Sequence, residues 1–207
     1  MPNTAMHPPA VIVFDLGGVL VDWNGTDPLV RLTGGRLSRE QARRFWMETP
    51  WVSGLDTGQL SPADFASAMA DALQLDLDQA QMLQALDDWL QGPYPGVQET
   101  LSRLSTRHRL AVLSNNNALH WGKIDREFDL LRHFPQQFAS HQLGLRKPDA
   151  AIYRHVRESL AVEPGDILFF DDNIECVQAA RAEGWQACHT VGFVAVQAEL
   201  AKRGLLD

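Results

Sequence analysis

Residues 10–20 read AVIVFDLGGVL. The run from Ala10 to Phe14 is continuously apolar and rich in β-branched residues, and it ends at Asp15 and the pair Gly17-Gly18. A short apolar run followed by turn residues is typical of a strand that is buried on both faces. This stretch therefore predicts the first strand of a parallel sheet, with Asp15 at its carboxyl end.

Short apolar runs alternate with helical segments in the second half of the chain. The expected strands are Leu110–Leu113, Gln137–Ala139, Ile167–Phe170 and Gln186–Val191. The expected helices are Val97 to about Thr106, a segment from Pro148 in a first helical turn to Leu160, one that ends near Gly184, and a last helix. Strands that alternate with helices imply an α/β fold with a doubly wound parallel sheet, as in Rossmann-like proteins.

The stretch from Trp23 to about Pro93 has a different character, because it contains no strand-like run and its helix-start signals recur. These signals are Ser38 with Gln41, Ser61 followed by Pro62, and Asp76 or Asp78. We therefore expect a small helical cap over residues 23–93, inserted into a core formed by residues 1–22 and 94–207.

Composition narrows the class of protein. The 207 residues carry 18 Lys and Arg against 26 Asp and Glu, a net charge of −8, which disfavours nucleic acid as a partner. The cysteines Cys176 and Cys188 do not form a disulfide framework. No signal peptide and no apolar run of membrane-spanning length is evident, so we expect a cytoplasmic protein with no membrane partner.

Polar residues follow the expected strands at Asp15, at Ser114-Asn115-Asn116 and at Asp171-Asp172-Asn173. The carboxyl ends of parallel strands meet at one edge of the sheet, where ligands bind. Carboxylates gathered there repel one another unless a cation lies between them, and oxygen ligands beside a phosphate favour Mg²⁺. With Lys147 nearby, Asp15 could attack phosphorus and form an aspartyl-phosphate. Each residue alone has an ordinary explanation as a turn former, a helix cap or a surface lysine, so their shared placement carries the prediction.

Four segments resemble the motifs of the haloacid dehalogenase superfamily, in its order and spacing and over nearly the whole chain. They are Val13–Leu20, Leu113–Asn115, Arg146–Asp149 and Phe169–Asn173. The insert, with LDTGQLS at residues 55–61, resembles the small cap of that superfamily. The stretches Ser114–Leu119 and Gly144–His155 look closest to bacterial phosphatases that act on α-glucose-1-phosphate.

The resemblance implies a role for each residue at the sheet edge. Asp15 is implied to be the nucleophile, and Lys147 to neutralise it and the phosphoryl charge. The implied Mg²⁺ ligands are Asp15, the carbonyl of Gly17, Asp172 and Asp171, the last through a bound water or by accepting from Lys147. The implied phosphate-binding residues are Leu16, Ser114, Asn115 and Lys147.

The sequence departs from the superfamily at Gly17, where most of its phosphatases carry a second Asp as general acid and base. That function is worth about 10²–10⁴ in rate. A sugar-1-phosphate needs it less, because its anomeric oxygen is a better leaving group than a simple alcohol. Asp22 or a residue from the cap is a candidate to carry the proton, although Asp22 could equally be part of the linker to the cap.

The sequence thus predicts a Mg²⁺-dependent phosphatase for a small phosphorylated metabolite, such as glucose-1-phosphate, in a monomer or weak homodimer. A metal-independent dehalogenase and a catalytically silent binding protein remain as alternatives, because both tolerate Gly17. In the cap, Trp46, Trp51 and Trp89 are either core residues or a surface that stacks on a sugar, and Trp51 is the best candidate for the latter. The histidines His120, His133, His141 and His155 are expected to be ordinary polar or helix-surface residues, with His120 the best candidate among them for the pocket. Hinges are expected near Val21–Asn24 and Gln91–Pro95.

Overall fold

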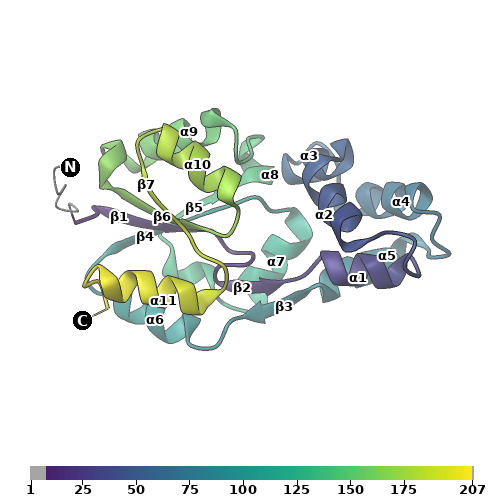
Figure 1. The fold of residues 1–207 in the computed structure, drawn as a ribbon, viewed down its shortest axis with the longest axis horizontal. Helices are drawn as coiled ribbons and strands as arrows, with labels where there is room; N and C mark the ends of the chain where they lie inside the picture. The colour runs from purple at the N-terminus through teal and green to yellow at the C-terminus, as the bar shows by residue number, and fades with distance from the viewer. Residues whose placement is uncertain (1–7, 207) are drawn as a thin grey trace.

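The computed structural model describes residues 8–206, so residues 1–7 and 207 of the predicted core lie outside the described part. Five parallel strands form the central sheet in the order β5-β4-β1-β6-β7 (Figure 1). Their bounds are β1 Val11–Phe14, β4 Arg109–Ser114, β5 Gln136–Ala139, β6 Ile167–Asp171 and β7 Gln186–His189. The predicted α/β fold with a parallel sheet is confirmed.

Helices cover both faces of this sheet (Figure 1). One face packs against α6 Val97–Leu104, α7 Ala118–Arg126 and α11 Phe193–Lys202, and the other against α9 Ala150–Leu160 and α10 Ile174–Ala182. Side chains alternate along β1, with Ile12 and Phe14 in the first apolar cluster and Val11 and Val13 in the second. All four are fully buried, which is why the strand reads as a continuous apolar run.

One helix start differs from the prediction. Pro148 was expected in the first turn of a helix, but α9 begins at Ala150, with Asp149 as its N-cap residue. The N–H of Asp149 donates to the carbonyl of Arg146, and this turn, which contains the cis peptide bond between Lys147 and Pro148, precedes the helix. Lys147 therefore lies in a turn rather than at the start of a helix.

The stretch between residues 24 and 89 folds into five helices: α1 Thr26–Leu32, α2 Arg39–Glu48, α3 Pro50–Asp56, α4 Pro62–Ala72 and α5 Gln79–Asp88. Three of them begin at the predicted cap residues Ser38, Ser61 and Asp78, whose side chains accept backbone N–H groups. Such caps stabilise a helix by about 0.5–2 kcal/mol each. These helices bury their own apolar cluster, separate from the two clusters against the sheet.

Two short strands join the helical stretch to the sheet, and the prediction of no strand between Trp23 and Pro93 was wrong. β2 Val21–Trp23 pairs with β3 Leu90–Pro93 in an antiparallel ribbon (Figure 1). Strands of three and four residues are too short to show the alternation by which strands are recognised. The ribbon occupies the segments in which hinges were expected.

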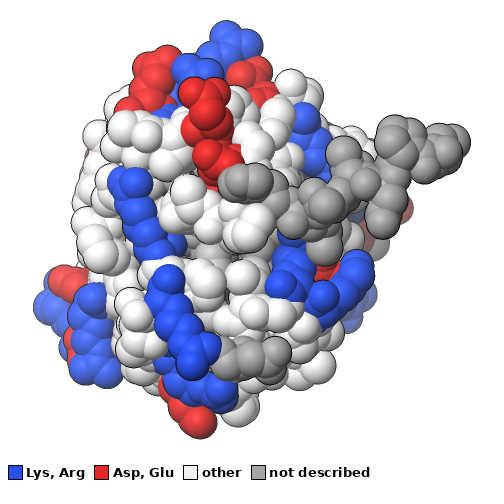
Figure 2. Space-filling view, turned by 90° about the vertical axis from the view of Figure 1, so that its left-hand side faces the viewer, with Lys and Arg blue, Asp and Glu red and all other residues white. Residues whose placement is uncertain are grey.

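The amino-terminal ends of the sheet strands face away from the cap. Figure 2 shows that end of the molecule, where the Lys and Arg side chains stand apart among uncharged and acidic residues. Within residues 8–206, no helix is both long and apolar enough to span a membrane. The carboxyl ends of the strands face the cap, and the candidate site lies there.

Candidate active site

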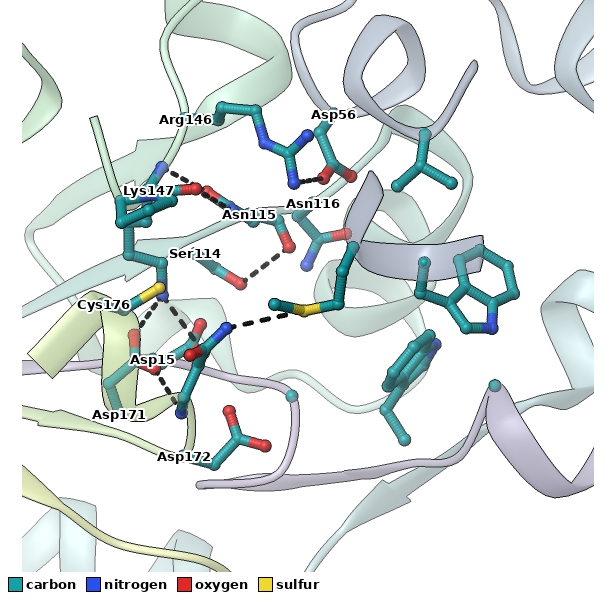
Figure 3. Close-up of a pocket in the computed structure, with 18 of the residues that line it drawn as sticks. Asp15, Asp56, Ser114, Asn115, Asn116, Arg146, Lys147, Asp171, Asp172 and Cys176 are labelled. Carbon is teal, nitrogen blue, oxygen red and sulfur yellow. Dashed lines mark hydrogen bonds and ion pairs between the residues drawn. The ribbon is translucent and has the colours of Figure 1, made fainter. Parts of the chain in front are cut away.

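A cavity of about 820 Å³ lies between the carboxyl edge of the sheet and the helical cap. Its core side is formed by residues that follow three neighbouring strands, Asp15 after β1, Ser114 at the end of β4 and Asp171 at the end of β6 (Figure 3). The cap side includes residues of α2 and α3. The predicted convergence of polar residues at one sheet edge is therefore present.

Lys147 is the most thoroughly bonded side chain of the cavity. It is 2% exposed, and its Nζ donates to Asp171 at 2.6 Å and to the carbonyl of Leu113 at 3.3 Å, and lies 3.1 Å from Asp15. Burial lowers the pKa of Lys147, but the two carboxylates outweigh burial and hold that pKa well above its usual value. Lys147 is therefore a permanent positive charge at the nucleophile position.

Three carboxylates meet beside this lysine. Oxygen atoms of Asp15, Asp171 and Asp172 lie within 4.8 Å of one another. Burial raises the pKa of Asp15 to about 7, with Lys147 lowering it and the two other carboxylates raising it further. Burial and Asp171 raise the pKa of Asp172 to about 6. One ammonium group does not balance three carboxylates, so the cluster favours a further cation.

The glycine turn after β1 is shaped around this cluster. Gly18 has φ +69°, and a Cβ atom at this residue would lie 2.2 Å from Oδ2 of Asp172. Only glycine combines this conformation with so close an approach. The pair Gly17-Gly18 thus lets the chain pass directly over Asp172 and brings Gly17 to the cavity.

The donor set of this edge fits Mg²⁺. Hard oxygen atoms from carboxylates and a backbone carbonyl are the ligands that Mg²⁺ prefers, and it uses few of them. The predicted ligands Asp15, Asp171, Asp172 and Gly17 all line the cavity. Asp171 accepts from Lys147 through Oδ2 and from the N–H of Asn173 through Oδ1, so its direct bonds are to protein groups.

The predicted phosphate-binding residues are all present at the edge, but the structure uses them differently. Both ends of the Asn115 amide bond the backbone of Lys147, with Nδ2 donating to its carbonyl and Oδ1 accepting from its N–H, each at 2.8 Å. The Asn115 side chain therefore positions the Lys147 turn. Ser114 is 1% exposed and lines the cavity. The N–H of Leu16 donates to Oδ1 of Asp15 at 2.7 Å, while its side chain is buried.

Asp22, the candidate proton carrier from the sequence, is exposed on the ribbon and is not among the described residues that line the cavity. His120, which was the best candidate among the histidines for the pocket, does line the cavity. Its Nε2 donates to the carbonyl of Leu86 at 2.8 Å, and its Nδ1 faces the amide of Asn117 at 3.3 Å. Burial lowers the pKa of His120, so this ring is a neutral link between α7 and α5.

The cap tryptophans were expected either in the cap core or against a sugar, and the structure places them in different surroundings. Trp51, the best candidate for a sugar contact, is 40% exposed and lies outside the described cavity lining. Trp89 is buried in the cap core, whereas Trp46 and Trp23 line the cavity and pack edge to face at 5.5 Å. Hydrophobic spacing in the sequence cannot distinguish a cap-core tryptophan from a cavity-lining one, because Trp46 packs against the cap cluster and also lines the cavity.

Sequence reasoning gave no role to Asp56 or Arg146. Asp56 ends α3, and its carboxylate lies 3.3 Å from the guanidinium of Arg146 across the cavity from the cap to the core (Figure 3). The side chains are 14% and 19% exposed. Both residues lie in segments that resemble the haloacid dehalogenase superfamily. That resemblance points to the segments but does not distinguish these two residues from their neighbours.

Comparisons with known proteins agree with this geometry. The chain matches the hydrolase family described as haloacid dehalogenase-like hydrolase over residues 9–184. Phosphatase MT3486 of Mycobacterium tuberculosis is 31% identical over 191 residues, which cover 86% of this chain and 85% of that protein.

Two solved structures are similar in fold. A predicted HAD-like family hydrolase from Porphyromonas gingivalis gives a TM-score of 0.79 at 24% identity, covering 98% of this chain and 100% of that one. A HAD family enzyme from Bacteroides thetaiotaomicron, in complex with magnesium and inorganic phosphate, gives a TM-score of 0.73 at 19% identity. The match covers 87% of this chain and 93% of that one. The chain therefore belongs to the family of haloacid dehalogenase-like hydrolases.

Proposed function

We propose that this hydrolase is a Mg²⁺-dependent phosphatase that cleaves small phosphate monoesters through an aspartyl-phosphate on Asp15. The observation that carries the proposal is the placement of Asp15, 3.1 Å from a buried lysine and within 4.8 Å of two further carboxylates. This arrangement supplies a carboxylate nucleophile, a fixed cation and a ligand set for a second cation in one cavity. The similarity to phosphatase MT3486 supports the same reaction class.

In the first step an oxygen of Asp15 attacks phosphorus, and the bond to the leaving oxygen breaks. Lys147 holds the attacking carboxylate in place and offsets charge on the phosphoryl oxygens. Ser114, which lines the cavity, would donate to those oxygens, while the Asn115 amide keeps the Lys147 turn in register with them. Water then cleaves the aspartyl-phosphate and restores Asp15.

The residues that would hold Mg²⁺ are Asp15, Asp172, the carbonyl of Gly17 and, through its hydrogen-bonding shell, Asp171. When bound, the ion neutralises the carboxylate cluster and the charge of the substrate phosphate. The Bacteroides enzyme of the same fold, which was solved with magnesium and inorganic phosphate, supports this assignment.

For the substrate we propose a sugar phosphate such as glucose-1-phosphate. A cavity of about 820 Å³ is of the size that accommodates a small metabolite. The side of the cavity toward the cap combines the aromatic rings of Trp23 and Trp46 with Asp56 of the cap and its partner Arg146 of the core, and carbohydrate rings bind to such mixed surfaces. An anomeric leaving group also suits a chain that carries Gly17 where an acid–base Asp is common in the family.

Gly17 also favours two other functions, a metal-independent dehalogenase and a silent binding protein. In a dehalogenase Asp15 would attack carbon, and the remaining carboxylates would have no cation to bind. Phosphate release in the presence of Mg²⁺ separates the phosphatase from both alternatives.

The test is inorganic phosphate release from a panel of sugar phosphates, with and without Mg²⁺, for the native chain and Asp15→Asn. We expect metal-dependent release that falls by roughly 10³-fold or more in the variant, since removal of a nucleophile eliminates the covalent route. A melting temperature for Asp15→Asn at or above that of the native chain would show that the loss is chemical. Release that is unaffected by the substitution would contradict the proposal, and no release from any ester would favour the two alternatives.

A further inference from the structure

The cap contributes one carboxylate to the cavity, that of Asp56. It lines the cavity from the last turn of α3, with its side chain 14% exposed. In the close-up it lies with Arg146 on the far side of Ser114 and Asn116 from the three core carboxylates (Figure 3). A phosphoryl group held at Ser114 and Lys147 would thus have Asp15 on one side and Asp56 toward the cap.

Asp56 is held close to the phosphate position by the ion pair with Arg146. Arg146 and Lys147 are consecutive residues, so their Cα atoms lie about 3.8 Å apart. The guanidinium that contacts Asp56 therefore belongs to the same turn as the ammonium that contacts Asp15. The two hydrogen bonds between the Asn115 amide and the backbone of Lys147 hold this turn in place.

The loop after α3 also rests directly on the core. Gly58 has φ +70°, and a Cβ atom at this residue would lie 2.3 Å from the carbonyl oxygen of His141 in α8 Ser140–Leu143. Next to it, the hydroxyl of Thr57 donates to the carbonyl of Ser53 at 2.7 Å and closes the end of α3. Asp56 thus stands on a cap element that is in contact with the core rather than on a free loop.

The electrostatic setting suits proton exchange near neutral pH. Burial raises the pKa of Asp56 to about 7, and Arg146 and then Lys147 lower it. A general acid works best when its pKa lies near the operating pH. The charged groups that act on Asp56 are these two cations.

The other ionisable groups of the described cavity lining are poorly suited to this role. Asp149, Glu175 and His189 are exposed at the rim, and the ring nitrogens of His120 are engaged with Leu86 and Asn117. The three core carboxylates belong to the nucleophile and the cation site. Asp56 remains as the carboxyl group that is sheltered, lines the cavity and lies on the side where a leaving group would be.

We propose that Asp56 is the general acid and base of this enzyme, supplied by the cap in place of the residue missing at Gly17; this rests on the phosphatase function proposed above. In the first step the P–O bond to the leaving group breaks, its electron pair stays on the leaving oxygen, and that oxygen takes the proton of the Asp56 carboxyl. In the second step the Asp56 carboxylate accepts a proton from water as that water attacks phosphorus, and the bond electrons return to Asp15. One ester and one water give one alcohol and one phosphate, and Asp56 ends protonated.

The experiment compares two esters with unequal need for a proton, α-glucose-1-phosphate and p-nitrophenyl phosphate, with the variant Asp56→Asn. The p-nitrophenolate ion leaves without protonation. We expect Asp56→Asn to lower kcat/KM for the sugar phosphate by about 10²-fold or more and for p-nitrophenyl phosphate by less than about 3-fold. A burst of p-nitrophenol equal to the enzyme concentration, followed by slow turnover, would report the lost base in the second step.

Arg146→Met is the matched control for cap placement, because it breaks the same ion pair and leaves the carboxyl group. It is expected to lower kcat/KM for the sugar phosphate by less than Asp56→Asn does, because the proton-carrying group is still present. Asp71→Asn, the same substitution on the exposed surface of α4, is expected to change neither. Equal losses for the two esters in Asp56→Asn, or no loss for the sugar phosphate, would overturn the proposal. A native chain that hydrolyses neither ester would remove the phosphatase function as well, so the two failures are distinguishable.

The structure also offers a rescue. Gly17 has space for a side chain, since a Cβ atom there would meet only Cβ of Trp23, at an ordinary 3.7 Å. Gly17→Asp places a carboxyl group at the position used elsewhere in the family. In the Asp56→Asn background it is expected to recover at least about tenfold of the loss with the sugar phosphate. The double variant should also return toward the native ratio of kcat/KM for the two esters. Recovered activity without a return of that ratio would contradict the assignment of Asp56 to proton transfer.

Discussion

The two walls of the cavity are built in different ways. On the core wall, Lys147 is bonded to three acceptors, and Asn115 uses both ends of its amide on the neighbouring turn. On the cap wall, Asp56 makes one ion pair with Arg146 of the core, and Trp46 Nε1 is buried without a hydrogen-bond partner in the described part of the chain. Lys147 and Asn115 of the core wall are thus each held by several bonds, whereas Asp56 of the cap wall is held by one ion pair.

This difference separates two tasks. Preorganised groups in a water-poor site stabilise developing charge most effectively, because they need no rearrangement during the reaction. In the proposed reaction the phosphoryl group, which is common to all substrates, would face the core wall. The leaving group, which differs among substrates, would face the cap wall. Changes to the core wall should therefore affect all esters alike, and changes to the cap wall should depend on the ester.

Removal of the metal is expected to have the largest effect. Chelation should abolish phosphate release from every ester, since three carboxylates would then oppose an anionic substrate with one lysine. Added Mg²⁺ should raise the free energy of unfolding by about 2.7 kcal/mol at 100 times its Kd. Asp172→Asn should lose most of that stabilisation in thermal melts. A shift of equal size in the variant would contradict the assignment of the metal ligands.

Lys147→Met tests the core wall directly. We expect kcat to fall by about 10²–10³-fold with every ester. The free energy of unfolding should fall by about 3–5 kcal/mol, because the substitution leaves buried carboxylates without their partner. Lys202→Met removes a lysine that is 69% exposed and paired with Glu199, and it should change neither quantity measurably. A loss confined to one ester would break the proposed division between the walls.

Asp56 should give the cap a stability that depends on pH. The folded state keeps its proton up to a pKa of about 7, whereas the unfolded chain releases it near 3.8. Between these values the folded state binds more protons, so its stability falls as pH rises, by at most about 4 kcal/mol. Asp56→Asn lacks this group. In urea titrations from pH 4 to 8, the free energy of unfolding of the variant should rise relative to that of the native chain up to about pH 7 and then level off. A difference between the two that stays constant with pH would argue against the raised pKa of Asp56.

The contact of the cap with the core is expected to have the smallest effect. Gly58→Ala and Gly34→Ala both place alanine at a positive φ, a strain of about 1–2 kcal/mol. Only Gly58 faces a backbone carbonyl, since Gly34 has nothing within 4 Å. We expect a larger loss of stability in Gly58→Ala, and a fall of about tenfold in kcat/KM for sugar phosphates in that variant alone. Equal activities in the two variants would show that this contact does not position the cap.

The elements that the sequence predicted well are those whose local signals agree with their tertiary surroundings. β1 is buried on both faces and reads as a continuous apolar run, and the helices of the cap begin at Ser38, Ser61 and Asp78, where side chains bond their own backbone. The convergence of Asp15 and Asp171 followed from strand topology alone. These features need no knowledge of distant contacts.

The features that escaped prediction depend on contacts between distant residues. The pairing of β2 with β3 joins residues about 70 positions apart, and each strand is too short to be recognised by itself. The Asn115 amide was expected on the phosphate, but it bonds a turn 32 residues away. Asp56 is an ordinary aspartate at a helix end until the fold brings Arg146 against it. Trp46 lines the cavity, whereas Trp51 is exposed outside its described lining, and neither placement can be read from hydrophobic spacing.

The antiparallel ribbon has a consequence for engineering. Because β2 and β3 run side by side, with Val21 opposite Pro93, the chain leaves and re-enters the sheet domain at neighbouring points. The 66 residues from Asn24 to Trp89 are thus a cassette with adjoining ends, and they supply all the buried residues of their apolar cluster, against which Leu119 of α7 packs. A helical cassette from another protein, spliced at Trp23 and Leu90, would meet an unaltered sheet edge. Such chimaeras offer a route to new leaving-group preferences on a single reaction centre.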